Sequence, residues 1–162
     1  MRILGIDPGV ATVGFGVIDS AGSKQTLVTY GTVETEAGVS LTHRLDRIYS
    51  DVTELITRFN PDSVAVEELF FNTNQKTGIT VAQGRGVILL AAFRSGVQVY
   101  EYTPLQVKQS VVGYGRAEKR QVQDMTRLLL RLTACPKPDD VADALAIAIC
   151  HAHSNNSLLR ML

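Results

Sequence analysis

Apolar positions along the chain change their spacing several times, and each change predicts a new element. Three strand-like runs come first, separated by short glycine-containing turns, as in an antiparallel meander. These runs cover residues 2–6, 12–19 and 25–34. Over residues 40–59 apolar residues then recur at spacings of three and four, which predicts an amphipathic helix with one face toward a core.

The rest of the chain alternates strand and helix patterns. Strands are predicted over 63–69 and 97–102, and the helix between them, 77–94, has more apolar surface than one core needs and is expected to contact a second subunit. Further helices are predicted over 103–112, 117–132 and 140–151, with a short flexible tail over about 154–162. Because a strand that follows a crossover helix runs parallel to its partner, the fold class is α/β, a mixed five-stranded sheet flanked by helices on both faces.

The composition of the chain narrows its class. We expect one domain over 1–162, because 162 residues of which 45% are hydrophobic supply one core. The 16 basic and 16 acidic residues exclude a protein that is basic all over, although a local basic face is still possible. Cys135 and Cys150 lack the spacing of a disulfide framework or a metal site and favour a reducing compartment. With neither a leader pattern nor a bilayer-length apolar run, we expect a cytoplasmic protein without membrane contact.

Carboxylates stand where strands are predicted to end side by side. Asp7 and Glu67 lie near the carboxyl ends of the first and fourth strands, whose backbones would be about 4.8 Å apart. Asp140 and Asp143, on the first turn of the last helix, could close the same crevice. Acids gathered in this way repel one another unless divalent cations bind them, and oxygen ligands suit Mg²⁺ or Mn²⁺. Two ions about 4 Å apart could activate a water and stabilise the leaving oxygen of a phosphodiester.

Each of these features also has an ordinary structural interpretation. Acids on a first helical turn commonly cap the helix, and Asp7 alone could accept hydrogen bonds from turn amides. The glycine-containing stretch 5–9 could instead cradle a nucleotide phosphate, as in actin-like ATPases, although that class needs a second lobe. A DNA-binding module without catalysis is the other alternative. His43, His151 and His153 lack metal-ligand company and are expected at the surface.

Basic and aromatic residues supply the features of a DNA-binding surface. Between residues 108 and 131, six basic residues stand against two acidic ones, an excess that suits a phosphate backbone. Within this stretch Arg116 and Arg120 are expected to contact DNA. Phe70, on a polar loop beside Glu67, could stack on bases or anchor in the core.

Five ordered motifs resemble the RuvC family of bacterial Holliday junction resolvases, which has the ribonuclease H-like fold. They are GIDPG at 5–9, VEELFF at 66–71, AQGRGV at 82–87, VKQSVVGYGRAEK at 107–119 and DDVADALAIAICHAH at 139–153. The resemblance covers nearly the whole chain. It implies a homodimeric, Mg²⁺-dependent endonuclease that cuts two opposed strands of a four-way DNA junction symmetrically and works with the RuvA–RuvB branch-migration complex.

The resemblance also implies roles for single residues. The four metal-binding acids of the family match Asp7, Glu67, Asp140 and Asp143. The three-residue spacing to the last of these selects Asp140 rather than its neighbour Asp139. The lysines that contact phosphate match Lys108 and Lys119, the second of which would offset developing charge, and the base-stacking aromatic matches Phe70. Two Mg²⁺ ions per subunit, with Mn²⁺ as a substitute, are expected to promote attack by water, leaving a 5′-phosphate and a 3′-hydroxyl.

Overall fold

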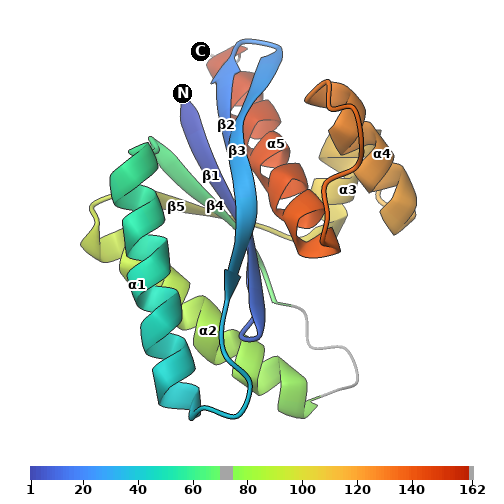
Figure 1. Cartoon of the computed structure of the whole chain (residues 1–162). Helices are drawn as coiled ribbons and strands as arrows, with labels where there is room; N and C mark the ends of the chain where they lie inside the picture. Colours follow the sequence, from blue (N-terminus) through green and yellow to red (C-terminus); the bar gives the residue numbers. More distant parts are fainter. Residues whose placement is uncertain (70–74, 161–162) are drawn as a thin grey trace.

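A computed structural model of the chain describes residues 1–69 and 75–160. Within these residues the chain forms one five-stranded sheet and five helices. The strands are β1 (Arg2–Asp7), β2 (Thr12–Ala21), β3 (Lys24–Glu34), β4 (Ser63–Glu67) and β5 (Gln98–Tyr102). The helices are α1 (Leu41–Phe59), α2 (Gln75–Arg94), α3 (Pro104–Val112), α4 (Lys119–Leu129) and α5 (Asp139–Arg160). Figure 1 shows α1 and α2 on one face of the sheet and α3, α4 and α5 on the other.

The sheet has the strand order β3-β2-β1-β4-β5, so the first strand is central and parallel to the fourth, as predicted. β1 is antiparallel to β2, with Asp7 opposite Gly14. β4 is parallel to both β1 and β5, and Glu67 pairs in register with Tyr102. The carboxyl ends of three parallel strands therefore meet at one edge of the sheet, which places Asp7 and Glu67 together.

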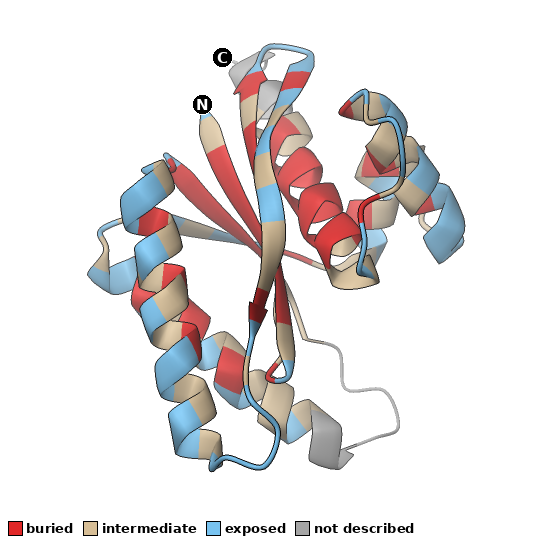
Figure 2. Ribbon diagram, viewed as in Figure 1, coloured by how far each residue is buried: buried red, intermediate tan, exposed pale blue. Residues whose placement is uncertain are grey.

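The alternation of side chains along the central strands divides the apolar residues between two layers. On β1, Leu4 and Ile6 pack in the cluster that includes Ile48 of α1 and Ile88 of α2. Ile3 faces the other way, into the cluster formed with α5. Figure 2 shows the consequence: α5 is buried along most of its described length, whereas α1 keeps an exposed outer surface. The period of two along the strand thus determines which residue supports which helical layer.

Several element boundaries differ from the predicted ones, three of them at the ends of β4, α4 and α5. β4 ends at Glu67 rather than at residue 69, because its partner strand β5 ends at Tyr102, and the last bond between them runs from the Glu68 amide to the Tyr102 carbonyl. α4 is shorter than predicted and ends at Leu129, since Arg131 has a left-handed φ of 55°. α5 continues to Arg160, well beyond residue 151, because neither glycine nor proline interrupts that stretch.

The prediction that His151 lies at the surface is wrong. His151 is 3% exposed, and its Nδ1 atom lies 2.7 Å from the hydroxyl oxygen of Tyr102. The Tyr100 ring covers it with a centroid distance of 4.3 Å. Because α5 is buried on all sides at this point, the imidazole is accommodated through a hydroxyl partner rather than through water. His43 is exposed, as predicted, and His153 is half-buried.

Candidate active site

Asp7 is the centre of the acidic cluster. Burial raises its pKa to about 8, and the neighbouring carboxylates of Glu67, Asp143 and Asp140 add to the rise, while Lys119 lowers it. These residues come from the ends of β1 and β4, the first turns of α5 and the start of α4. The structure therefore brings together the four acids that the sequence singled out, around a carboxylate that lacks enough positive charge to stay ionised easily.

Glycines determine how closely α5 approaches the sheet. A Cβ atom built on Gly14 would lie 2.1 Å from the Asp140 carbonyl oxygen, and one on Gly5 would lie 2.2 Å from that of Ala144. Any side chain at these positions would push the start of the helix away from Asp7. This packing role of the two glycines was not predicted from the sequence, where glycines indicated only turns or phosphate contacts. Glycines within strands opposite an alanine-rich helix were the available signal.

Lys119 supplies positive charge next to the acids. Its Nζ atom lies 2.9 Å from a carboxylate oxygen of Asp143 and 3.6 Å from one of Asp139. Although burial opposes it, hydrogen bonding and charge attraction to Asp143 and Asp139 raise the pKa of Lys119. Burial raises the pKa of Asp143, and the same ion pair with Lys119 works against the rise. Lys119 is therefore a protonated partner of the cluster.

The lysine cavity, which we define by Glu67, Lys108, Lys119 and Asp143, opens on the α3–α5 side of the cluster. Burial and Asp143 raise the pKa of Glu67, whereas Lys119 and Lys108 lower it. Both predicted phosphate-contacting lysines thus lie near Glu67, one of the four acids. Arg116 and Arg120 do not line this cavity, and the Arg120 side chain, 90% exposed, lies 4.0 Å from Asp124. Phe70 lies outside the described residues.

A second cavity lies on the other side of the acids. We call it the turn cavity, and it is lined by Gly9, Val10, Ala11, Thr12, Arg44, Thr80, Val81 and Asp140.

Asp139, the neighbour of Asp140, is paired with two lysines instead. It accepts a hydrogen bond from Lys137 Nζ at 3.1 Å, and its carboxylate lies 3.6 Å from Lys119 Nζ. The acid that joins the cluster is therefore Asp140, the residue chosen on spacing. Among the residues described, no three carboxylate, imidazole or thiol groups already form a closed metal-ligand set.

Arg85 secures the strand that carries Glu67, a role that sequence reasoning missed. Its Nε atom donates to the Glu67 backbone carbonyl at 2.9 Å, and its guanidinium pairs with Glu101 on β5. The side chain is 15% exposed. A single arginine within the apolar stretch of α2 was the only signal in the sequence. One side chain thus ties the ends of β4 and β5 together beside the acids.

The mixed sheet, with acids where its parallel strands end, defines a nuclease of the ribonuclease H-like class. The family model for crossover junction endodeoxyribonuclease RuvC matches residues 3–151, and the chain belongs to this family. A curated RuvC from Caldanaerobacter subterraneus subsp. tengcongensis is 58% identical, covering 99% of this chain and 98% of that protein.

Solved structures agree with this assignment. The Thermus thermophilus RuvC structure has a TM-score of 0.90 at 41% identity, over 97% of this chain and 96% of that one. The T. thermophilus RuvC in complex with a Holliday junction substrate has a TM-score of 0.89 at 39% identity, with the same coverage of both chains. In the described part of the present chain, no helix is both long and apolar enough to cross a bilayer.

Proposed function

We propose that this chain resolves four-way DNA junctions by nicking two opposed strands symmetrically. Family membership supports the class of reaction, endonucleolytic hydrolysis of DNA. The observation that carries the proposal is the convergence of Asp7, Glu67, Asp140 and Asp143 from three elements onto one edge of the sheet, with Lys119 among them. Recombination and DNA repair are the processes that produce such junctions. Because the substrate is chromosomal DNA, the protein would act in the cytoplasm.

The acidic cluster fits divalent cations. A buried carboxylate with a pKa raised to about 8 by burial and by three more acids is stabilised by any cation that binds among them. Its donors are all carboxylate oxygens, the ligands that Mg²⁺ and Mn²⁺ prefer. The residues that would hold two Mg²⁺ ions are Asp7, Glu67, Asp140 and Asp143. When bound, such ions supply activation of water and charge stabilisation at a phosphodiester, leaving a 5′-phosphate and a 3′-hydroxyl.

The lysines orient the phosphate that is cut. Lys119 is already held beside Asp143, so its ammonium is fixed close to where negative charge develops during hydrolysis. Lys108 faces the same cavity from α3 and can hold the phosphate from a second direction. Lys119 is thus a donor that is in place before the DNA arrives, which is the condition for electrostatic catalysis.

A homodimer would present two such sites to the two equivalent strands of a junction. The exposed face of α2 supports this assembly. Its outward residues, spaced by three and four, are Ile79, Gln83, Gly86, Leu90 and Phe93. Phe93 is 79% exposed and Ile79 is 58% exposed. A Cβ atom on Gly86 would meet no described atom within 4 Å, so this position leaves room for a second helix to approach closely.

The dimer can be tested without disturbing the subunit. Gly86→Gln adds a side chain into open space in one chain, so the fold should persist, while two such chains should no longer pack along α2. We expect light scattering to give one chain mass for this variant and two for the parent. Ser50→Gln, on the exposed face of α1, is the matched control and should remain dimeric. A dimeric Gly86→Gln protein would place the interface elsewhere.

The central experiment incubates the protein with a synthetic four-way junction or a matched duplex, in Mg²⁺ or in chelator, and maps cuts on each strand. We expect paired, symmetric nicks confined to the junction and only in Mg²⁺. Binding without cutting under every metal tried would refute catalysis and leave a DNA-binding module. The RuvA–RuvB complex, the partner that the family resemblance implies, is tested by co-purification on the same junction.

A further inference from the structure

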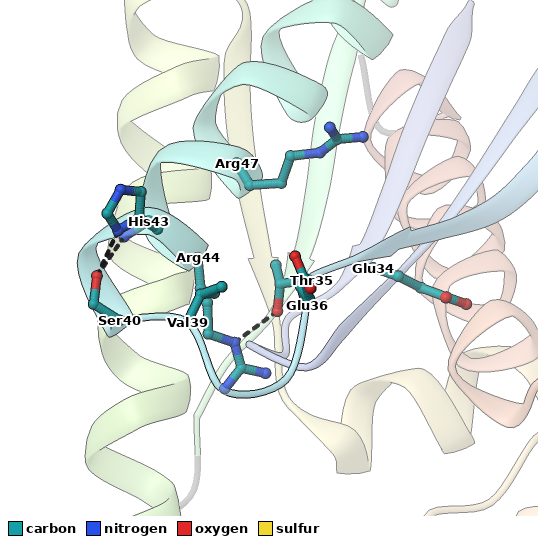
Figure 3. Close-up of a pocket in the computed structure, with 8 residues that line it drawn as sticks. All are labelled: Glu34, Thr35, Glu36, Val39, Ser40, His43, Arg44 and Arg47. Atoms are coloured by element: carbon teal, nitrogen blue, oxygen red, sulfur yellow. Dashed lines mark hydrogen bonds between the residues drawn. The ribbon is translucent and has the colours of Figure 1, made fainter.

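Arg44 is tied to the turn that follows Asp7. From α1, its Nε atom donates to the Thr35 hydroxyl at 2.7 Å, and that hydroxyl donates in turn to the Val10 carbonyl. Figure 3 shows Arg44 extending to Thr35, while Arg47, one helical turn further on, points away from it. Within residues 1–69 and 75–160, the side-chain hydrogen bonds of Arg44 use only its Nε atom, so the two terminal nitrogens of its guanidinium keep their donors.

Arg44 forms no ion pair with a carboxylate among the described residues. Glu34 and Glu36 line the adjoining cavity that Figure 3 shows, but neither is paired with it. Arg47, by contrast, forms an ion pair with Asp51 at 2.7 Å. Arginine side chains held in place without an acidic partner are suited to bind an anion with two parallel hydrogen bonds.

Arg44 also lines the turn cavity, which contains Asp140 of the acidic cluster. The cavity has a volume of about 610 Å³ and runs from Asp140 across the Gly9–Thr12 turn to Thr80 on α2. The lysine cavity lies on the opposite side of the acids, against α3 and α4. Figure 1 shows α1 and α2 on one face of the sheet and α3 to α5 on the other. Residues of α1 and α2 line the turn cavity and residues of α3 and α4 line the lysine cavity, so the two cavities flank the acids on either side of the sheet edge.

A DNA strand whose scissile phosphate lies at the acids extends from them in two directions, and one cavity lies on each side. The lysine cavity has two cations, and the turn cavity has Arg44. We propose that Arg44 binds a phosphate of the cut strand next to the scissile one, so that the strand is held on both sides of the reacting bond. This proposal rests on the proposed function, because it extends the DNA path of the same site.

The first test measures junction binding in chelator, where no cutting occurs, for Arg44→Gln, Arg47→Gln and Thr35→Val. The Arg44→Gln variant loses one charge-assisted contact, so it should bind the junction about tenfold more weakly than the parent. The salt dependence of its binding should be smaller by about one counterion. Arg47→Gln, which loses a charge from the same helix outside the turn cavity, should bind like the parent. Thr35→Val, which removes only the tether, should lower affinity less than Arg44→Gln.

The second test removes the charge from the DNA instead. Single neutral methylphosphonates are placed at successive positions around the cut site of the junction. One position beside the scissile phosphate should weaken binding by the parent and by Arg47→Gln, but should not weaken Arg44→Gln further, as expected of two partners in one contact. If every position weakened Arg44→Gln and the parent equally, or if Thr35→Val matched Arg44→Gln throughout, Arg44 would be a tether for the turn and the proposal would be wrong. Cutting of the unmodified junction by the parent in Mg²⁺ reports on the proposed function separately.

Discussion

Gly14 and Asp140 approach so closely that a Cβ atom on the glycine would lie 2.1 Å from the carbonyl oxygen of the aspartate. The contact joins the start of β2 to the first turn of a helix more than a hundred residues later in the chain. It places Asp140 beside Asp7 because Asp7 and Gly14 are paired in the sheet. Close packing of backbone against backbone is thus what assembles the acidic cluster.

Gly14→Ala should therefore impair both folding and cleavage. The added methyl must displace the start of α5, and overpacking of this kind lowers the free energy of unfolding by about 1–3 kcal/mol. Chemical denaturation measures the first effect and junction cleavage at saturating Mg²⁺ the second. Ser50→Ala serves as the stability control, because Ser50 lies on the exposed face of α1 and alanine is the better helix former, so the free energy of unfolding should rise slightly. Unchanged cleavage by Gly14→Ala would show that the helix can shift without moving the acids.

Arg85 should affect the metal requirement more than the fold. Arg85→Gln removes the donor that Glu67's carbonyl accepts at 2.9 Å, so the end of β4 loses its tie to β5. We expect the Mg²⁺ concentration for half-maximal cleavage to rise about tenfold, because Glu67 is then less well positioned. Glu101→Gln removes the ion pair but leaves the bond to the carbonyl, so a smaller rise is expected. Equal Mg²⁺ curves for parent and Arg85→Gln would remove this role.

Asp7 should limit both the pH range of activity and the stability of the metal-free protein. A bound cation must displace the proton from this carboxyl, whose pKa burial raises to about 8, so at low Mg²⁺ cleavage should increase from pH 6 to pH 8. Asp7→Asn should reduce cleavage by at least about a hundredfold.

The linkage of stability to pH has the opposite direction. The folded protein binds this proton more tightly than the unfolded chain, so in chelator stability falls as pH rises from about 4 toward 8. Asp7→Asn should therefore be more stable than the parent at pH 8 in chelator, by about 1 kcal/mol or more. Denaturant titrations at pH 5 and pH 8 measure this difference. A less stable variant at pH 8 would mean that Asp7 contributes a structural contact instead.

His151 should make the fold sensitive to mild acid. Burial lowers the pKa of this imidazole, so its protonated form is disfavoured in the folded protein. The contribution of His151 to the free energy of unfolding should hence decline as the pH falls below about 6.5, where the unfolded chain gains the proton first, a slope opposite in sign to that of Asp7. In His151→Gln the decline between pH 7 and pH 5 should be smaller. The control His43→Gln, on the exposed start of α1, should retain the dependence of the parent.

The sequence by itself determined the order of elements and the place of the acids. Strand alternation and helical spacing are local properties of the backbone, so β1 and β4 could be placed side by side and Asp7 and Glu67 at their ends. The spacing of Asp140 and Asp143 on one helical turn is likewise a local property. The acidic cluster could therefore be predicted from the chain directions of two strands and the position of one helix.

Tertiary structure alone decided how these parts contact one another. The approach of Gly14 to Asp140, the bond from Arg85 to the Glu67 carbonyl and the burial of His151 against Tyr102 join residues far apart in the chain. No periodic pattern records such pairs, because each depends on the distance and angle at which whole elements pack. The direction of Arg44 toward the turn cavity belongs to the same kind, since a charged position on a helix has no partner until the layers around it are assembled.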